Sequence, residues 1–247
     1  MSATALKIAT NAVSKVLKWA ATKLIKSPCV ILQRGEICSF IHDGFVVKVP
    51  DKSAELFQRE LEIVESAAFA TSLGFVDARV VEPSLELTRA LPRGIKAVPR
   101  VILMPVLSGG CAVDTDLARL DPHIISTTVI DWHCRLIDRG WYHTDCKLDT
   151  LWVLSSGEIR FTDWSSLCPA VRDDPIFTYY LEGCMTSPHA CMSINLVVML
   201  AELFGGKAPT TSSVAYAEYV DLREMVLDQL RQPARARLAK ILVVPSH

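Results

Sequence analysis

The stretch "HTDCKLDTLWVLSSGEIRFTDWSS", which runs from His143 to Ser166, decides how the fold of this chain is interpreted. Its centre predicts two short strands around the turn 155–157, because apolar and β-branched residues flank Ser-Ser-Gly. Asp145 stands before the first strand and Asp163 stands after the second. Two interpretations follow: a β-hairpin with acidic loops, or two carboxylates held together for chemistry.

The composition is that of a packed globular protein. The chain has 247 residues, of which 50% are hydrophobic and 21% are charged, and its formal net charge is −1. This length allows one large domain or two modest lobes with a sizeable core. The composition argues against disorder, and the charge near zero argues against a basic nucleic-acid-binding protein.

The eight cysteines are scattered and include no C-x-x-C pair. No secretory leader is recognisable ahead of them, so we expect reduced thiols in a cytoplasmic or nuclear protein. Cys184, His189 and Cys191 resemble half of a zinc site, but no second pair lies at zinc spacing, and we predict no zinc there. The longest apolar run, 194–204, is shorter than the roughly 18 to 20 residues that cross a bilayer and predicts a buried helix.

Residues 1–27 are predicted to form a basic amphipathic helix. Lysines dominate this segment, no acidic residue precedes Glu36, and apolar residues recur at helical spacing. Three interpretations compete: docking on the body of the protein, contact with a membrane surface or a partner through Trp19 and the lysines, and a targeting segment. Docking is the simplest of the three, and membrane contact is not favoured.

Residues 28–107 predict a small, β-rich lobe. Val, Ile and Phe in 29–50 indicate two or three short strands, and Asp43-Gly44 is a dipeptide typical of hairpin turns. A helix with an apolar stripe is expected over 52–74. Further strands are expected at 77–81, 84–88 and 98–107.

Residues 108–247 predict a second, mainly helical lobe. Asp121 as N-cap and Pro122 at the first helical position begin a helix that ends at Gly140. Further helices are expected at 192–204 and near 214–232. The order of the elements predicts the α+β fold class.

Four motifs of this chain resemble those of the protein kinases, in the same order. "HTDCKLDT" resembles the kinase catalytic loop H-R-D-L-K-x-x-N, and "TDW" resembles the metal-binding D-F-G. Lys48 in "FVVKV" and Glu60 in "FQRELEI" stand where the family keeps the V-A-I-K lysine and its helical partner. The resemblance covers 29–209 and implies a bilobal fold, with a β-rich N-lobe that contains one main helix and a truncated, α-helical C-lobe.

The resemblance implies a role for each matching residue in a phosphoryl transfer that depends on positioning and charge neutralisation. Lys48 would hold the α- and β-phosphates of ATP and would be oriented by Glu60. Asp145 would act as the catalytic base, and Lys147 would neutralise charge on the transferred phosphate. Asp163 would ligate Mg²⁺.

The same resemblance implies further contacts with ATP and Mg²⁺. Gly35 would lie in the loop that covers the nucleotide. Met104 and Val106 would lie in the strand and hinge that border the nucleotide. Asp149 and Thr150 would complete the metal site.

The nucleotide and metal motifs depart from the family pattern. Gln33 and Cys38 replace the glycines that flank Gly35, and a β-carbon there hinders close approach of the backbone to phosphates. Thr150 replaces a metal-binding asparagine, and we expect the carboxylate of Asp149 to compensate.

Two further departures concern regulation and the support of the catalytic loop. Thr144 replaces the arginine that usually receives an activation-loop phosphate, so switching by loop phosphorylation is not expected. Met192 replaces an aspartate that braces the loop in the family. Few residues follow Pro209, and this truncation resembles compact, divergent kinases of the sort that some viruses encode.

The expected partner is a protein substrate phosphorylated on Ser or Thr, because members with this specificity commonly carry lysine at the position of Lys147. A regulatory protein is a second expected partner, and nucleic acid is not expected. Three alternatives stay open. The first is a pseudokinase that binds partners without transferring phosphate, and the second is a small-molecule kinase of the aminoglycoside or choline type. In the third, the aspartates are turn residues of an unrelated α+β domain.

Overall fold

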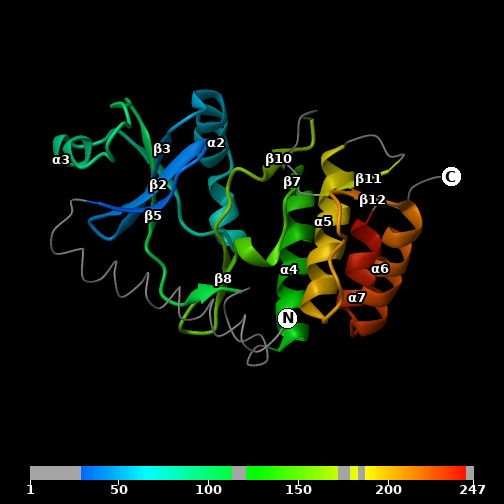
Figure 1. Ribbon diagram of the computed structural model, residues 1–247. Helices are drawn as coiled ribbons and strands as arrows, with labels where there is room; N and C mark the ends of the chain where they lie inside the picture. The colour runs from blue at the N-terminus through cyan, green and yellow to red at the C-terminus, as the bar shows by residue number, and fades with distance from the viewer. Residues whose placement is uncertain (1–28, 113–120, 172–178, 183–186, 243–247) are drawn as a thin grey trace, which may run out of the picture. The chain divides into compact units, whose positions relative to one another are not determined.

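A computed structural model of the chain describes residues 29–112, 121–171, 179–182 and 187–242. The fold is of mixed α+β class, with an antiparallel sheet and several helices (Figure 1), as the sequence predicts. The described chain divides into two compact units. The first comprises 29–68 and Asp77–Leu107, and the second comprises Phe69–Val76 and 108–242. The predicted N-terminal helix at 1–27 lies outside the described residues.

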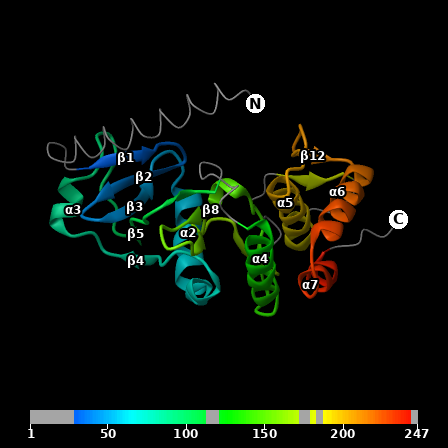
Figure 2. The same ribbon diagram turned by 90° about the horizontal axis from the view of Figure 1, so that it is seen from below.

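The first unit is built on one antiparallel sheet of five strands in the order β1-β2-β3-β5-β4, which Figure 2 shows side by side. The turn between β2 and β3 confirms the predicted hairpin, because Asp43 and Gly44 both have positive φ, at 47° and 77°. The strands are β1 (Val30–Gln33), β2 (Ile37–His42), β3 (Phe45–Pro50), β4 (Arg79–Val81) and β5 (Val101–Pro105).

Helix α2 (Ala54–Ser66) follows β3 and buries Phe57, Leu61 and Val64. Ser53 caps its start, since the Ser53 hydroxyl accepts a hydrogen bond from the Leu56 amide at 3.1 Å. The helix ends at Ser66, earlier than predicted, and a 3₁₀ turn η1 (Ala68–Leu73) continues the chain. The hydroxyl of Ser66 donates to the carbonyl of Glu62 at 2.6 Å, and such side-chain bonds compete with regular helix.

The prediction of a strand at 84–88 is wrong, because these residues belong to a short helix, α3 (Leu85–Arg89). The Ser84 hydroxyl accepts from the Leu87 amide at 3.1 Å and caps the helix. Leu87 packs in the core cluster with Phe40, Val47 and Val49 of the sheet. The Ser84 cap therefore favours a helix in a segment whose alternating apolar residues would otherwise be typical of a strand.

Helix α4 (Pro122–Ile137) opens the helical part of the second unit and confirms the predicted helix there. Asp121 caps it by accepting from the His123 amide at 2.8 Å. On its buried face, Trp132 lies against Gly74, where an added Cβ would come within 2.2 Å of the indole ring. Gly74 also has a φ of +96°, so this close approach requires glycine on two counts.

Short strands of the second unit form small sheets. The predicted hairpin around 155–157 is confirmed, with Gly157 at a φ of 85°. Strand β6 (Gly110–Cys111) adds to β8 (Leu151–Val153) and β9 (Ile159–Phe161). The remaining pairs are β7 (Trp141–His143) with β10 (Leu167–Pro169), and β11 (Tyr180–Leu181) with β12 (Ser213–Val214).

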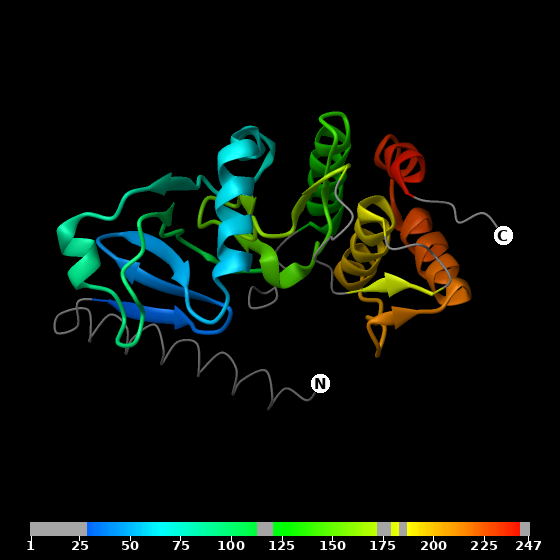
Figure 3. The ribbon, with the colours of Figure 1, turned by 90° about the horizontal axis from the view of Figure 1, so that it is seen from above.

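Helix α5 (Pro188–Leu203) is almost wholly buried and lies between α4 and α6 (Tyr216–Gln229) in Figure 3. It confirms the buried helix expected at 192–204, but it begins earlier because Ser187 caps it and Pro188 occupies its first position. The helix expected near 214–232 ends at Gln229, and α7 (Ala234–Ile241) follows. Among the helices that the structure describes, none is long and apolar enough to span a bilayer.

Candidate functional site

Lys48 and Glu60 form an ion pair inside the first unit. The Lys48 Nζ lies 2.5 Å from the Glu60 Oε1, and the two side chains are 14% and 1% exposed. Lys48 comes from the middle of β3 and Glu60 from α2, so the pair joins the sheet to the helix packed on it. A lysine held in this way presents a fixed positive charge next to a carboxylate that compensates it.

The period-two alternation of β3 explains why Lys48 points toward α2. Val47 and Val49 are buried in the core cluster that includes Phe40 and Leu87. Because successive side chains of a strand point to opposite faces, Lys48 must point to the other face of the sheet. Glu60 lies on the buried side of α2 with Leu61 and Val64, which brings its carboxylate to that face.

The other residues of the first unit that were singled out from the sequence lie at the two ends of β3. Gly35 lies in the turn after β1, and the neighbouring Glu36 accepts backbone hydrogen bonds from Asp51, just beyond the last residue of β3. Val106 donates its amide to the Gly44 carbonyl at 3.1 Å, just before the first residue of β3. Met104 pairs with Val46, and its side chain is buried, whereas Val106 is exposed. Gly35 and Val106 are therefore not neighbours but bracket β3 and its lysine.

In the second unit, the loop after β7 brings Asp145 and Lys147 together. The Lys147 Nζ donates to the Asp145 Oδ2 at 2.9 Å, and Asp145 is buried. A 3₁₀ turn, η3 (Leu148–Thr150), follows directly and carries Asp149. The chain thus places two carboxylates and an ammonium within five consecutive residues of one loop.

The electrostatics show that Asp163 belongs to the same group. Burial lowers the pKa of Lys147, but the hydrogen bond with Asp145 and the charges of Asp145, Asp149 and Asp163 outweigh it, so the pKa is raised. The pKa of Asp149 is raised by burial and by the charges of Asp145 and Asp163, against the effect of Lys147. The three carboxylates and Lys147 therefore act on one another as one cluster, in which negative charge exceeds positive charge.

The carboxylate of Asp163 is held by the two serines of "DWSS". Its Oδ1 accepts from the Ser165 amide at 3.1 Å and from the Ser165 hydroxyl at 2.6 Å. Its Oδ2 accepts from the Ser166 hydroxyl. These serines were not singled out from the sequence, although the side chain of an aspartate commonly accepts from the backbone amide two residues later.

Two threonines fix the backbone around the cluster. The Thr144 amide and hydroxyl both donate to the Ser166 carbonyl, at 2.8 and 3.0 Å. The hydroxyl of Thr150 donates to the Lys147 carbonyl at 2.9 Å. Thr144 therefore ties the loop of Asp145 to the loop of Asp163, and Thr150 tightens the turn that carries Asp149.

His143 lies behind the loop and is fully buried against Phe75 and Phe161, with ring centroids 5.3 and 4.7 Å away. Burial lowers its pKa to about 4, although the charge and the backbone of Asp163 oppose this effect. The imidazole is therefore neutral near pH 7. Its burial in an aromatic setting agrees with a role in bracing the loop.

Tyr179 and Asn195, which we did not single out from the sequence, border the cluster. Asn195 of α5 holds the backbone of Tyr179 through its amide group, at 3.3 Å to the nitrogen and 3.1 Å to the carbonyl. Burial raises the pKa of Tyr179, and the charges of Glu202 and Asp145 raise it further, whereas Lys147 lowers it. An asparagine inside an apolar helix is a signal for such a contact, because buried amides need partners.

The cluster fits a divalent cation by the chemistry of its donors. Asp149 and Asp163 offer carboxylate oxygens, which are the ligands that Mg²⁺ prefers, and the pKa of Asp149 is raised partly by neighbouring negative charge. Cys184, His189 and Cys191, which were considered from the sequence as half of a zinc site, are a separate set of residues. Cys184 lies outside the described residues, and the His189 Nε2 lies 2.6 Å from the Ile241 carbonyl oxygen.

Comparison with known proteins does not assign the chain to a family. No protein-family model matches it, and no curated protein matches it.

Proposed function

We propose that this chain is a protein kinase-like phosphotransferase that uses ATP and Mg²⁺ to phosphorylate Ser or Thr of protein substrates. In this proposal residues 28–107 and 108–247 are the two lobes of a divergent, bilobal kinase fold. The observation that carries it is the ion pair between Lys48 and Glu60, at 2.5 Å. The kinase resemblance names these two residues as partners, although they lie on different elements and twelve positions apart.

The arrangement of the first unit supports an elongated ligand along β3. Gly35 adjoins one end of this strand, Val106 adjoins the other, and Lys48 lies between them. Six residues of strand span roughly 20 Å, which suits a nucleotide whose base and phosphates bind at opposite ends. The base would lie near Met104 and Val106, and Lys48 would contact the α- and β-phosphates.

The cluster of the second unit supports the chemistry of transfer. Asp145, buried and hydrogen-bonded to Lys147, would accept the proton of the substrate hydroxyl and align its oxygen. Lys147 would neutralise charge on the transferred phosphate. Asp163 and Asp149, with Thr150 beside them, would hold Mg²⁺, which when bound neutralises the charge of the phosphate oxygens.

A phosphate-transfer assay tests the proposal. Purified full-length protein is incubated with labelled ATP, Mg²⁺ and a mixture of protein substrates. Wild type should transfer label, whereas Asp145→Asn and Lys48→Met should lose at least about 100-fold of the rate. The matched controls are Asp138→Asn and Lys52→Met, which change exposed residues of the same kinds and should keep the wild-type rate. Equal, background-level signal from all five proteins would contradict the proposal.

A second candidate is a pseudokinase that binds partners, and perturbed nucleotide and metal motifs favour it. The turn between β1 and β2 is short, and Arg34 in it is committed to an ion pair with Asp51 at 2.9 Å. Thr150, in place of a metal-binding asparagine, directs its hydroxyl to the Lys147 carbonyl. Binding of a fluorescent ATP analogue without phosphate transfer, together with retention of a protein partner by Asp145→Asn, would select this candidate.

A further inference from the structure

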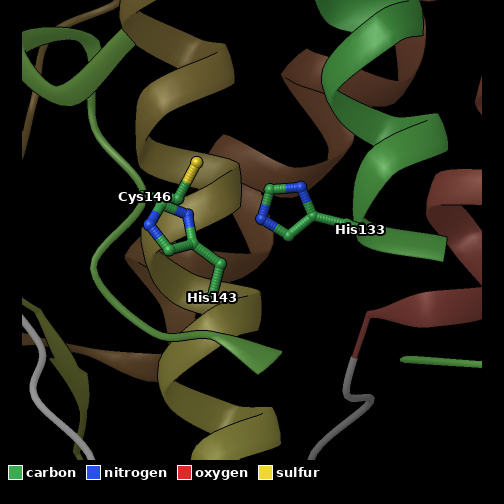
Figure 4. A group of neighbouring side chains, drawn as sticks. All are labelled: His133, His143 and Cys146. Atoms are coloured by element: carbon green, nitrogen blue, oxygen red, sulfur yellow. The ribbon is translucent and has the colours of Figure 1, made fainter. Parts of the chain in front are cut away.

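Three buried side chains with metal-binding groups meet inside the second unit. They are His133 of α4, His143 at the end of β7, and Cys146. Figure 4 shows the imidazole of His133 directed from α4 toward the other two side chains. Their ligand atoms all lie within 4.8 Å of one another, and each residue is at most 1% exposed.

The ring nitrogens of this group are short of hydrogen bonds. The Nδ1 of His133 lies 2.8 Å from the Val129 carbonyl oxygen, so it carries the proton and leaves Nε2 as the acceptor. Within the described residues, the Nε2 of His133 makes no hydrogen bond, and the ring of His143 has only a backbone interaction with Asp163 that lies outside normal hydrogen-bond geometry. Buried polar atoms without partners are rare, and one explanation for them is an ion that they bind.

Both imidazoles are in the form that binds metals. Both rings are fully buried, and burial disfavours the charged imidazolium form. They are therefore neutral near pH 7, with a lone pair available on a ring nitrogen. The bond from the His133 Nδ1 to a backbone carbonyl is the kind of second contact that orients a ligating histidine.

A fourth donor lies next to the thiol. The Sδ of Met199, on α5, is 3.2 Å from the Sγ of Cys146, and Met199 is fully buried. Two imidazoles, a thiolate and a thioether form a soft donor set, which suits Cu⁺ among the common ions. The rings of Phe75 and Phe161 pack on His143 and exclude water from this side of the group.

One thiolate neutralises Cu⁺ completely, whereas it leaves a net charge of +1 on Zn²⁺. The surroundings are not purely apolar, because the charges of Asp145 and Asp163 act on Cys146 and His143. The preference for Cu⁺ over Zn²⁺ therefore rests on the soft donor set.

We propose that His133, His143, Cys146 and Met199 bind one Cu⁺ ion. Binding forms a copper–sulfur bond and breaks the S–H bond of Cys146, whose proton leaves to solvent, and no atom changes its oxidation state. Metal–ligand bonds of about 2.0 to 2.3 Å require the donor atoms to approach one another by about 1 Å, which side-chain rotation supplies. The proposal is independent of phosphate transfer.

Copper retention by the full-length chain tests the proposal. The protein is refolded without oxygen in a reductant and chelator-buffered Cu⁺, then desalted and analysed for copper. Wild type should retain one ion per chain, and its X-ray absorption should show both nitrogen and sulfur ligands. Cys146→Ala should bind at least about 100-fold more weakly. The matched control is Cys168→Ala, which removes another fully buried thiol of the same unit and should bind as wild type does.

A conservative variant covers the case in which Cys146→Ala does not fold. Met199→Leu keeps the volume of the core, and its circular dichroism should match wild type. It should bind Cu⁺ about tenfold more weakly and lose part of the sulfur signal. Four results would overturn the proposal. The first is no copper on the wild-type protein, and the second is equal retention by Met199→Leu and wild type when no sulfur is found among the ligands. The third is loss of copper from Cys168→Ala instead of Cys146→Ala, and the fourth is displacement of Cu⁺ by an equimolar amount of Zn²⁺.

Discussion

The Ser166 carbonyl accepts two hydrogen bonds from Thr144, at 2.8 Å from its amide and 3.0 Å from its hydroxyl. Thr144 is the residue before Asp145, and Ser166 binds the carboxylate of Asp163. One carbonyl therefore links the two loops that carry the acidic cluster. In the kinase family that the motif resembles, an arginine usually stands at this position, whereas here Thr144 makes the link.

Replacing the Thr144 hydroxyl should weaken this link. Thr144→Val keeps the shape and the amide bond but removes one buried hydrogen bond, so the free energy of unfolding should fall by about 1 to 2 kcal/mol. Urea unfolding measures the change. Thr128→Val is the control, because its hydroxyl donates to the Ile124 carbonyl within the exposed part of α4, and the loss of this bond should cost less than about 0.5 kcal/mol. Equal losses in the two variants would contradict the prediction.

The Lys48–Glu60 pair should behave as a buried ion pair. Lys48→Met leaves the carboxylate of Glu60, which is 1% exposed, without its cation, so stability should fall by about 3 kcal/mol. Adding Glu60→Leu removes the stranded charge, and the double variant should regain most of the loss. Denaturant unfolding of wild type, both single variants and the double variant gives the four free energies of unfolding that a double-mutant cycle requires. Additive losses would show that the two charges do not interact.

Gly74→Ala should be strongly destabilising. Its Cβ would lie 2.2 Å from the Trp132 ring, at a φ of +96°. The expected loss is about 3 kcal/mol or more, from overpacking added to the left-handed backbone. Gly157→Ala separates the two causes, because Gly157 has a φ of +85° but open space around it. Its loss should be only about 1 to 2 kcal/mol, and thermal unfolding should rank the two variants in this order.

The metal-free protein should lose stability as the pH falls from 6.5 toward 4. Burial holds the folded pKa of His133 at about 3 and that of His143 at about 4, so the unfolded chain binds more protons in this range. The two histidines should contribute a slope of up to about 2.7 kcal/mol per pH unit, and nothing above their unfolded pKa. Urea unfolding at stepped pH measures the slope, which should fall by about half in His133→Gln. An unchanged slope would contradict this assignment.

Asp149 should matter for the metal requirement if the proposed phosphate transfer is correct. Asp149→Ala removes one carboxylate from the cluster and should raise the Mg²⁺ concentration for half-maximal rate by at least about tenfold. Rates measured across a Mg²⁺ series give this value. Asp138→Ala, at an exposed position, is the control and should leave the requirement unchanged. An unchanged requirement in Asp149→Ala would remove this residue from the metal site.

Local signals in the sequence predicted the structure correctly where particular residues restrict the backbone dihedral angles. Asp43-Gly44 and the turn at 155–157 specify hairpins because they supply left-handed residues, and Asp121-Pro122 specifies the start of α4. The predictions failed where a single serine decided the outcome. Ser84 caps a helix in a segment whose apolar alternation favours a strand. Ser66 lies at the last turn of α2, which apolar periodicity alone would extend.

The candidate site was predictable only in part. Asp145, Lys147, Asp149 and Asp163 were singled out from the sequence and influence one another's charge in the structure. The serines that hold Asp163 were missed, although their spacing was visible. The group of His133, His143 and Cys146 with Met199 has no sequence signal, because its members come from separate elements and only packing brings them together.

The placement of Phe69–Val76 determines how the chain can be dissected. This segment belongs to the second unit, although the residues before and after it belong to the first. The ring of Phe75 packs in tilted geometry against Phe161 and Trp164, and the Trp164 indole donates to the Val76 carbonyl at 3.0 Å. A fragment that starts at Ser108 would lack these partners and would expose aromatic surface. To produce the second unit by itself, residues 69–76 should be supplied as a separate peptide or fused to the end of the fragment. Cutting the chain before Ser108 alone should not give a soluble fragment.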